Sequence, residues 1–504
     1  MNARLRDYLI WNAGHRLGAW VLNRERAVLE AGAPRRVTLA RRFAPSRCSA
    51  LQRFCALVVL VSAFVIRASS LAFAAEARPN FLIILTDDHG YGDVSTYHAS
   101  DVRTPNIDRL AAEGMLFTTM RANCTVCSPS RAALLTGRYA DRVGVPGVIR
   151  TQPLDSWGYL DPNVPTLANE LKRAGYHTSI VGKWHLGLRS PNTPNERGFD
   201  FFHGFLGDMM DSYTTHRRHG ENYLRRNAEV IDPPGHATEI FSGWAMDYLR
   251  ERAAIKEQPF FLYLAFNAPH FPIEPPAKWL AQVQQRAPQL SEKRAKNVAL
   301  IEHLDAHIGR VLAVLDETDL ARNTVVAFTG DNGGSLPHAQ DNTPWRDGKQ
   351  SHYDGGLRVP FMMRWPTRIQ AGSRTDYAGL NFDLFPTFLE LAGAKLPADL
   401  DAVSLVPLLN GGTITTPRDL YFVRREGGAA YGGKSYEAII RGEWKLLQND
   451  PYSPLELYNL KNDPQEKNNV AAANPKILKE LSTALRGHIQ RGGGSPWQER
   501  EASP

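Results

Sequence analysis

The sequence predicts an α/β protein in which a large, mostly parallel or mixed sheet is sandwiched by helices and followed by a smaller C-terminal α+β domain. Short apolar runs alternate with helix-periodic segments over residues 76–408, which is typical of parallel strands covered on both faces. From residue 409 onward, glycine-rich breaks interrupt the strand-like runs. With 504 residues, 43% of them hydrophobic and 22% charged, the chain can bury a sizeable core.

Four runs of residues are expected to be strands buried on both faces, because they are continuously apolar and rich in branched side chains. They span residues 81–85, 178–181, 260–266 and 325–328. Helical periodicity occurs between them, in residues 105–114, 164–174, 238–256 and 293–317. In sheets of this kind, ligands bind beyond the carboxyl ends of the strands. The polar residues that directly follow these strands are therefore the first candidates for a functional site.

The C-terminal region is predicted to be a small unit of antiparallel strands and one helix. Glycine pairs at Gly411-Gly412 and Gly427-Gly428 mark breaks in the chain. The expected elements are strands at residues 438–447 and 455–460 and a last helix near 475–490. These patterns divide the chain into a leader (1–75), a main α/β domain (76–408) and a small-sheet subdomain (409–504).

Most of the positive charge lies in the leader. The whole chain has a formal net charge of +7, whereas residues 1–75 contain 12 arginines, no lysine and 3 acidic residues. The rest of the chain is therefore slightly acidic, and the basic overall charge does not indicate nucleic-acid binding. We expect no nucleic-acid partner. The sequence makes no prediction about the oligomeric state.

The leader ends in the pattern of a secretory signal peptide. Basic residues precede an apolar stretch, residues 55–66, and small residues then lead to an expected cleavage site near Ala74 or Ala75. The short apolar stretch favours cleavage over membrane anchoring, although Arg67 leaves an uncleaved anchor open. The residues before it are either a basic extension or the product of a start assigned too far upstream. We therefore predict export to the periplasm or the medium.

Four candidate oxygen ligands follow two of the predicted strands. Asp87 and Asp88 come after the first strand, and Asp331 and Asn332 come after the last. Three carboxylates and one amide form a hard-oxygen environment that suits Ca²⁺ or Mg²⁺ rather than Zn²⁺. Each pair alone is more typical of a turn. Their matching positions at strand ends favour one shared metal site.

Cys127 has an unusual setting. It stands four residues before Arg131, with a Ser-Pro-Ser segment between them and an Ala/Leu run of helical character behind. Together with Cys124 it forms a C-x-x-C pair, which by itself is compatible with a redox dithiol, half of a zinc site or two ordinary thiols. The sequence has no second zinc pair, because Cys48 and Cys55 lie in the leader.

Cationic side chains form a further group of candidates. Lys183 and His185 directly follow a predicted strand, and His270 lies just beyond another. Lys349 belongs to an Arg-Asp-Gly-Lys segment. Each residue alone is more often a surface group or a satisfied core residue. Gathered around a metal ion together with Arg131, they would form a pocket for a compact tetrahedral oxyanion.

These residues also carry a resemblance to a known family. The segment CSPSR (127–131) resembles the signature of the formylglycine-dependent sulfatases, which are arylsulfatase-like members of the alkaline phosphatase superfamily. Further segments similar to sulfatase landmarks follow in the family's order: TPNIDRL (104–110), GKWH (182–185), GFD (198–200), DGGLRVP (354–360), DLFPT (383–387) and ELYNL (456–460). The resemblance implies an alkaline phosphatase-like sandwich and makes residues 76–408 the catalytic domain.

The resemblance also implies a mechanism. A separate maturation enzyme oxidises Cys127 to formylglycine, whose aldehyde hydrates to a geminal diol. One hydroxyl, held by Ca²⁺ and deprotonated, attacks the sulfur of a sulfate ester, and the other later expels sulfate. Mg²⁺ is the second choice of ion. By this resemblance the metal ligands are Asp87, Asp88, the modified Cys127, Asp331 and Asn332.

Each cationic residue receives a role from the same resemblance. Arg131 steadies the modified side chain and the metal ligands. Lys183, Lys349 and His270 hold the sulfate and the bridging oxygen. Either His270 or Lys349 gives a proton to the leaving group, and His185 takes the proton from the second hydroxyl.

The predicted function is hydrolysis of sulfate monoesters, either aryl sulfates or sulfated carbohydrates. Two alternatives stay open: a formylglycine-dependent phosphonate monoester or phosphodiester hydrolase, and a catalytically silent binding protein with unmodified Cys127. The loop 208–223 and the surroundings of Trp345 are candidates for the mouth of the pocket. Trp345, Asp347 and Asp354 depart from the family's pattern and are expected in the pocket wall, where they would affect substrate identity.

Overall fold

The structure, a computed structural model, describes residues 78–97, 99–426 and 435–499. The predicted leader with its signal peptide, Cys48 and Cys55, and the glycine break at 427–428 lie outside the described residues. In the part of the chain that is described, no helix combines the length and the apolar composition needed to span a membrane.

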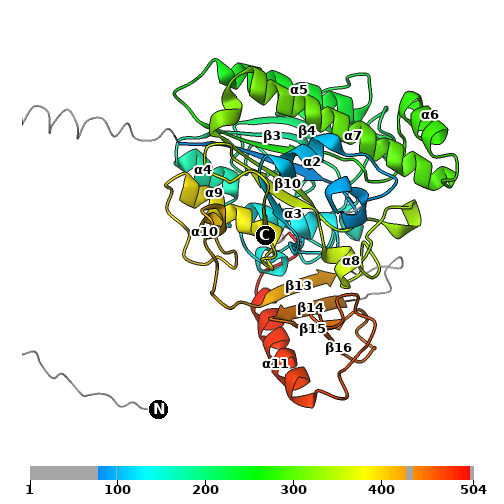
Figure 1. The fold of residues 1–504 in the computed structure, drawn as a ribbon. Helices are drawn as coiled ribbons and strands as arrows, with labels where there is room; N and C mark the ends of the chain where they lie inside the picture. Colours follow the sequence, from blue (N-terminus) through cyan, green and yellow to red (C-terminus); the bar gives the residue numbers. More distant parts are fainter. Residues whose placement is uncertain (1–77, 98, 427–434, 500–504) are drawn as a thin grey trace, which may run out of the picture. The chain divides into compact units, whose positions relative to one another are not determined.

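A ten-stranded mixed sheet runs through the larger part of the molecule (Figure 1). Its strand order is β12-β2-β11-β10-β1-β9-β3-β4-β7-β8. The five central strands are parallel, and most outer pairs are antiparallel. The strands are β1 (Asn80–Thr86), β2 (Met115–Phe117), β3 (His177–Lys183), β4 (Phe201–Phe205), β7 (Leu224–Arg226), β8 (Glu229–Val230), β9 (Phe260–Ala265), β10 (Thr324–Gly330), β11 (Phe361–Arg364) and β12 (Ser373–Thr375).

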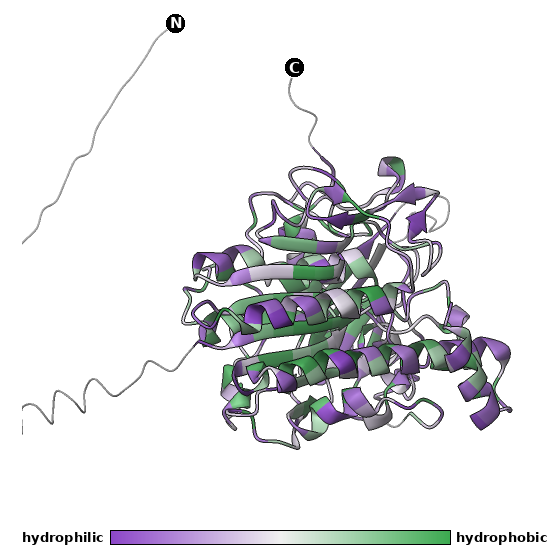
Figure 2. Ribbon diagram, turned by 90° about the horizontal axis from the view of Figure 1, so that it is seen from above, coloured by the Kyte–Doolittle hydropathy of each residue, from purple (hydrophilic) through white to green (hydrophobic). Residues whose placement is uncertain are grey.

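Both faces of the central strands are buried, which explains why these strands are continuously apolar in the sequence. Phe81, Ile83 and Leu85 of β1 face a core formed with α3 (Cys127–Thr136), α4 (Leu167–Arg173) and α9 (Leu384–Leu391). Leu82 and Ile84 face the opposite core, which is formed with α2 (Pro105–Ala112), α5 (Ala237–Ala253) and α7 (Glu292–Glu317). Figure 2 shows the green, apolar strands between helices whose outer faces are purple. The predicted fold class and the four predicted central strands are confirmed.

The predicted helices are also confirmed, with their ends moved by up to three residues. Thr166 accepts a hydrogen bond from the backbone N–H of Asn169 and caps α4, and Ser291 does the same for Arg294 at the start of α7. Shorter elements are α6 (Ala277–Arg286), α8 (Asp354–Leu357), α10 (Val406–Leu409), the strand pair β5 (Arg217–Arg218) and β6 (Glu221–Asn222), and 3₁₀ turns at Tyr91–Asp93, Ser95–Tyr97, Ala140–Val143, Pro153–Asp155, Leu320–Asn323, Leu336–His338 and Asn381–Asp383.

The register of the parallel strands brings their carboxyl ends to one edge. Thr86 of β1 lies opposite Gly330 of β10, and Leu85 lies opposite Ala265 of β9. Ala265 in turn lies opposite Gly182 of β3. The residues that follow these positions are the predicted polar candidates. They therefore share one edge of the sheet.

A second sheet of four antiparallel strands follows, covered by one helix. The prediction of one strand over residues 438–447 is wrong, because Gly442 has a positive φ of 57° and the chain turns back there. Arg441 consequently pairs with Trp444 in a two-residue hairpin. The elements are β13 (Leu420–Arg425), β14 (Ser435–Arg441), β15 (Trp444–Gln448), β16 (Glu456–Asn459) and α11 (Pro475–Gly492).

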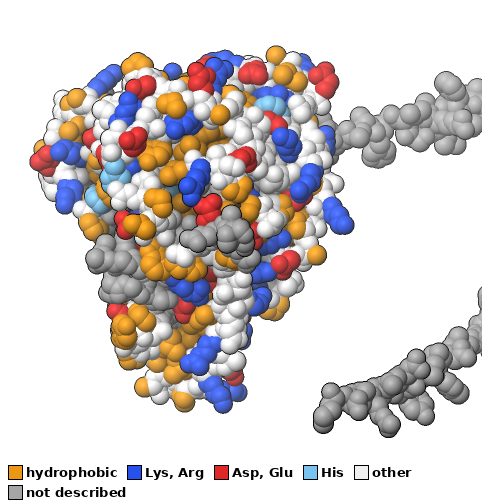
Figure 3. Space-filling view, turned by 180° about the vertical axis from the view of Figure 1, so that it is seen from behind, with side chains coloured by type: hydrophobic (Ala, Val, Ile, Leu, Met, Phe, Trp, Pro, Cys, Tyr) orange, Lys and Arg blue, Asp and Glu red, His pale blue; other side chains and the backbone are white. Residues whose placement is uncertain are grey.

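The surface drawn in Figure 3 carries both signs of charge. Lysine and arginine side chains are interspersed with aspartate and glutamate over this face, with apolar side chains between them. This distribution agrees with the near-balanced charge of the chain after the leader.

Candidate active site

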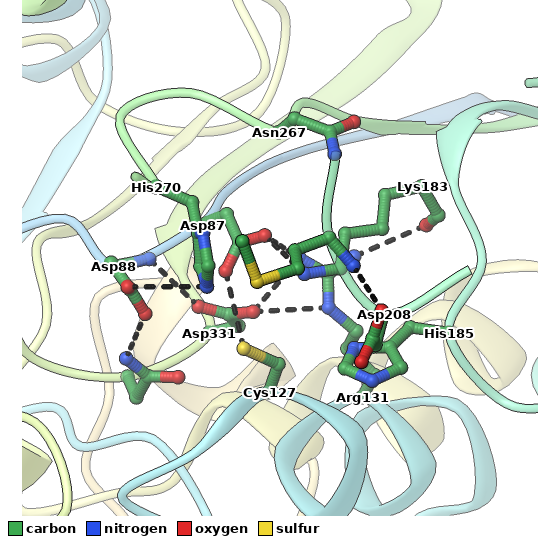
Figure 4. A network of polar contacts seen from close by, with 12 residues as sticks. Asp87, Asp88, Cys127, Arg131, Lys183, His185, Asp208, Asn267, His270 and Asp331 are labelled. Carbon is green, nitrogen blue, oxygen red and sulfur yellow. Dashed lines mark hydrogen bonds and ion pairs between the residues drawn. The ribbon is translucent and has the colours of Figure 1, made fainter. Parts of the chain in front are cut away.

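Cys127 is the first residue of α3 and faces the end of the central strand β1 (Figure 4). Its thiol lies 3.3 Å from Asp87 Oδ1, to which it donates a hydrogen bond. The helix begins here because Val126 is extended and Pro129 fits the first turn, where its missing N–H is not needed. Gly137 adopts the left-handed conformation that ends the helix.

Arg131 lies one helical turn after Cys127 and reaches the same strand ends. Its guanidinium donates from Nε and Nη2 to Asp331 Oδ2, at 3.0 and 2.8 Å, and from Nη1 to the carbonyl oxygen of Lys183 at 3.1 Å. It also lies 3.6 Å from Asp87. The spacing of four residues in the sequence is therefore the spacing that places both side chains on one face of α3.

The two acidic strand ends are joined by hydrogen bonds. Asp88 has a positive φ of 60°, and its backbone N–H donates to Asp331 Oδ1 at 3.1 Å. The Asn332 amide donates from Nδ2 to Asp88 Oδ1 at 2.8 Å. Asn332 Oδ1 is buried and has no hydrogen-bond partner among the residues that the structure describes. An unpaired buried carbonyl oxygen next to carboxylates is a free ligand position.

Two lysines neutralise the carboxylates. Lys183 Nζ lies 2.5 Å from Asp87 Oδ2, and Lys349 Nζ lies 2.6 Å from Asp88 Oδ2. Lys349 also donates to His270 Nε2 at 3.1 Å. His270 Nδ1 donates to the carbonyl oxygen of Phe271 at 2.6 Å, and this bond fixes the tautomer in which Nε2 carries the lone pair.

His185 is buried at the same edge in a left-handed conformation with φ of 60°. Its Nε2 donates to the carbonyl oxygen of Ile149 at 2.8 Å, whereas its Nδ1 is buried and has no partner in the described part of the chain. Burial, together with Lys183 and Arg131, holds the pKa of His185 well below its usual value. His185 is therefore a neutral imidazole with one free lone pair, which suits a proton acceptor.

Burial and neighbouring charges shift the pKa values of four further groups, two downward and two upward. Burial raises the pKa of Asp87, but Lys183 and the other cations outweigh burial and hold it well below the usual range. Burial and the neighbouring Asp87 raise the pKa of Asp331 to about 7. The same two causes raise the pKa of the Cys127 thiol well above its usual value. Burial and Lys349 lower the pKa of His270 to about 4.

The donor set fits a divalent cation. One ligand atom each from Asp87, Asp88, Cys127 and His270 lies within 4.8 Å of the others. The free Oδ1 of Asn332 adds a further oxygen beside Asp88. Carboxylates with an amide oxygen favour a hard cation. His270, which was predicted to bind the sulfate, contributes one of these four atoms.

A cavity of about 100 Å³ opens above Cys127, between His185, His270 and Lys349. Its lining also includes Arg150, Asp208, Met209, Gln350, Arg424 and Glu426, most of which are charged or polar. Asp208 and Met209 belong to the candidate loop 208–223, and Gln350 directly follows Lys349. Arg150, Arg424 and Glu426 come from segments with no predicted motif, and the fold brings them to the cavity.

Similarity to known proteins agrees with this site. A family model described as Sulfatase matches residues 79–394, well over half of the chain. The chain belongs to the sulfatase family. A second model, described as the C-terminal region of N-sulphoglucosamine sulphohydrolase, matches residues 343–491. The sulfatase is accordingly a sulfuric ester hydrolase, as the sequence predicted.

Individual relatives cover most of this sulfatase. It is 34% identical over 396 residues to the N-acetylgalactosamine-6-sulfatase of Canis lupus familiaris, covering 74% of this chain and 72% of that protein. It is 30% identical to the N-acetylgalactosamine-6-O-sulfatase of Bacteroides thetaiotaomicron, over 81% of this chain and 92% of the relative. A crystal structure of Ps i-CgsB in complex with k-i-k-neocarrahexaose superposes with a TM-score of 0.76 at 30% identity. The match covers 84% of this chain and 95% of that chain.

The three residues at which the sulfatase departs from the family's pattern are not in the cavity wall, contrary to prediction. Trp345 packs against Tyr91 and under the guanidinium of Arg358. Asp347 accepts a hydrogen bond from the backbone of the next residue. Asp354 lies in a buried group of ion pairs. Trp345 and Asp354 are thus engaged in packing and ion pairs, whereas Asp347 is exposed.

The structure also places the C-x-x-C pair and Tyr213 of the candidate loop. Cys124 and Cys127 are both free and buried, and Cys124 donates to the carbonyl oxygen of Val423 at 3.2 Å, away from the site. In the loop, Tyr213 is buried and its hydroxyl bonds the carbonyl oxygens of Asn267 and His270. Tyr213 thus supports the His270 segment from behind instead of lining the mouth.

Proposed function

We propose that this sulfatase removes sulfate from a carbohydrate ester, with formylglycine at position 127 as the nucleophile and Ca²⁺ as the ion. The convergence of four ligand atoms, including the sulfur of Cys127, within 4.8 Å carries this proposal. A side chain at that position is close enough to a cation for both to act on one substrate group. Formylglycine in place of the thiol would supply an oxygen nucleophile there.

The ion is proposed to be held by Asp87, Asp88, Asp331 and Asn332 together with residue 127. The free Oδ1 of Asn332 supports this set, because an oxygen-rich site with an orphaned amide oxygen suits Ca²⁺ better than a softer metal. When bound, the ion would neutralise sulfate oxygens and lower the pKa of a hydroxyl at position 127. Arg131 holds Asp331 in place from the helix side.

In this proposal, the lysines and histidines of the site have separate roles. Lys183 and Lys349, whose ammonium groups already face the site, hold the sulfate oxygens. Because His270 Nδ1–H is committed to Phe271, Lys349 is the group that can deliver a proton toward the leaving oxygen. His185, with its free Nδ1, takes the proton that must leave position 127 when sulfate is expelled.

A sulfated carbohydrate is the favoured substrate class. The cavity of about 100 Å³ above Cys127 suits a single sulfate group. A neighbouring cavity of about 560 Å³ shares Arg150 with it and offers room and polar groups for sugar rings. Relatives named for N-acetylgalactosamine 6-sulfate and a structural relative carrying a neocarrahexaose support the same class.

Mass spectrometry of the tryptic peptide 122–131 tests the nucleophile. Protein made together with a formylglycine-generating maturation enzyme should contain an aldehyde at position 127 in place of the thiol. Cys127→Ala should lower kcat by roughly 10⁴-fold or more. Cys124→Ala is the matched control and should keep most of the activity, since the hydrogen bond of its thiol goes to the carbonyl oxygen of Val423, away from the site. A fully active enzyme with an unmodified thiol would exclude this mechanism.

The substrate class is tested with three compounds: a 6-sulfated N-acetylgalactosamine oligosaccharide, 4-nitrophenyl sulfate and bis(4-nitrophenyl) phosphate. We expect a higher kcat/KM for the sulfated sugar than for the aryl sulfate, because only the sugar fills the second cavity. The phosphodiester should be the poorest substrate. Faster hydrolysis of the phosphodiester would favour the phosphonate monoester and phosphodiester hydrolases instead.

We further propose that the enzyme is exported. The basic leader followed by an apolar stretch and small residues is the support for this proposal. N-terminal sequencing of the protein from the periplasmic fraction or the medium should find a start near residue 76. An intact leader on protein held in the cytoplasm would contradict export.

A further inference from the structure

A second group of metal-binding side chains lies on the other side of the large sheet, between α5 and α7. Glu239 belongs to α5, and His303 and His307 belong to α7. The two helices pack side by side over the sheet, as Figure 1 shows. One ligand atom from each of the three residues lies within 4.8 Å of the others. None of the three takes part in the sulfatase site.

The spacing of the two histidines suits chelation. Residues four apart on a helix project from the same face, one turn above the other. His303 Nε2 lies 3.3 Å from Glu239 Oε1 on the neighbouring helix. Two imidazoles and one carboxylate thus converge from two rigid elements.

Hydrogen bonds orient His307 for binding through one ring nitrogen. The Ser242 hydroxyl donates to the carbonyl oxygen of Glu239 at 2.9 Å, so its oxygen accepts from His307 Nδ1 at 2.7 Å. His307 therefore carries its proton on Nδ1 and keeps its lone pair on Nε2. A ligating histidine held by a hydrogen bond from its other nitrogen is the usual arrangement in metal sites.

His303 and His307 are neutral, as metal binding requires. Burial and the neighbouring histidines lower the pKa of His303 to about 3, and burial lowers the pKa of His307 to about 4. His303 is fully buried, and its Nδ1 has no partner within residues 78–97, 99–426 and 435–499. The side chain of Glu239 is 49% exposed, which gives an ion a route from solvent.

A third histidine nearby is excluded as a ligand. His236 packs edge-on against His303, with ring centroids 4.7 Å apart. Its Nε2 donates to the carbonyl oxygen of Glu274 at 3.0 Å, and its Nδ1 accepts from the backbone N–H of Thr238 at 3.2 Å. Both ring nitrogens are therefore in use, and the site has three protein ligands.

We propose that Glu239, His303 and His307 bind a divalent transition-metal ion of the zinc class, which ties α5 to α7. Two imidazole nitrogens and one carboxylate oxygen match Zn²⁺, whereas the oxygen-rich sulfatase site matches Ca²⁺. A water molecule would complete the coordination on the exposed side of Glu239. The protein would thus carry two metals of different chemistry, one at the edge where the parallel strands end and one between two helices that cover a face of the sheet.

The test is a calorimetric titration of Zn²⁺ into the enzyme with Ca²⁺ in excess. We expect one equivalent of Zn²⁺ to bind and to raise the melting temperature of the wild-type protein. The double variant His303→Gln/His307→Gln should bind at least 10-fold more weakly, with no rise in melting temperature. His219→Gln, at an exposed histidine, is the matched control and should bind as the wild type does.

Two further variants keep the test decisive if the double variant does not fold. Glu239→Gln changes a half-exposed side chain and should abolish tight binding. Ser242→Ala removes the partner of His307 and should weaken binding roughly 10-fold. Equal Zn²⁺ binding by wild type and Glu239→Gln would overturn the proposal. Loss of Zn²⁺ binding in Asp88→Asn but not in Glu239→Gln would also overturn it, because Zn²⁺ would then occupy the sulfatase site.

Discussion

Each buried carboxylate at the sulfatase site has a cation of the chain beside it. Unpaired buried charges are strongly unfavourable, so such pairing keeps the acidic strand ends stable before any ion binds. The three pairs are Lys183 with Asp87, Lys349 with Asp88, and Arg131 with Asp331. The same ammonium groups then remain in the site to contact an anionic substrate.

Replacing Lys349 with methionine tests its role as proton donor. The loss in kcat should be about 10²–10⁴-fold for a sugar sulfate, whose alkoxide leaving group needs a proton. It should be clearly smaller for 4-nitrophenyl sulfate, whose phenolate leaves unprotonated. The measurement is kcat for both substrates.

Lys183→Met is the matched control for Lys349→Met. Lys183 faces Asp87 and is assigned only to holding sulfate, so its loss should slow both substrates by a similar factor. An equal loss for both substrates in Lys349→Met would contradict proton donation by Lys349.

At the scale of elements, the close packing of β3 against its neighbours places Lys183. Gly182 has a positive φ of 105°, and a Cβ there would lie 1.9 Å from the carbonyl oxygen of Ala265 on β9. On the other side, Gly182 lies opposite Gly204 of β4. Only glycine fits this conformation and this space. The chain can therefore turn at the end of β3 and direct Lys183 toward Asp87.

Gly182→Ala should consequently destabilise the protein by about 1–3 kcal/mol through overpacking. It should also lower kcat/KM, because Lys183 moves with the backbone. Gly487→Ala in α11 is the control: apart from the backbone of α11 itself, no atom of the described residues lies within 4 Å of its Cβ position, so alanine should raise stability by up to about 1 kcal/mol. Melting curves measure both changes. An unchanged melting temperature for Gly182→Ala would contradict this prediction, because β3 and β9 would then accommodate the added methyl group without loss of stability.

At the scale of the whole molecule, a buried group of charges connects the two sheets. Asp354 of α8 accepts from Arg121, Arg358 and Lys445, at 2.6, 2.8 and 2.9 Å. Lys445 belongs to β15 of the small sheet and also pairs with Glu466 at 2.7 Å. Since α8 follows Lys349 by five residues, these ion pairs fix the small sheet against the segment that carries Lys349.

Lys445→Met should lower the free energy of unfolding by about 3–5 kcal/mol, because it leaves the buried carboxylate of Glu466 without its cation and removes one of the three cations around Asp354. Lys461→Met, at an exposed lysine of the same region, should have little effect. The double variant Lys445→Met/Glu466→Gln should lose less unfolding free energy than Lys445→Met. Guanidinium unfolding midpoints give the comparison. An equal loss of unfolding free energy in the single and the double variant would exclude the unpaired charge as the cause.

The sequence predicted the elements whose local pattern matches their final environment. The central strands are buried on both faces, so their apolar runs reveal them directly. Outer strands such as β2 and β12 are only three residues long and were not predicted, because pairing and not composition defines them. The hairpin at Gly442 was missed for a similar reason, since apolar residues continue on both sides of a two-residue turn.

The sequence by itself determined the fold class and the set of polar side chains at the strand ends. The position of these polar residues directly after a buried strand is a local property of the chain, and so is the motif around Cys127. Tertiary structure alone decided which cation pairs with which carboxylate, which histidine lone pair is free, and which residues line the cavity. It also decided that Glu239 meets His303 and His307. These contacts join residues far apart in the chain, and packing geometry sets them without leaving a local pattern.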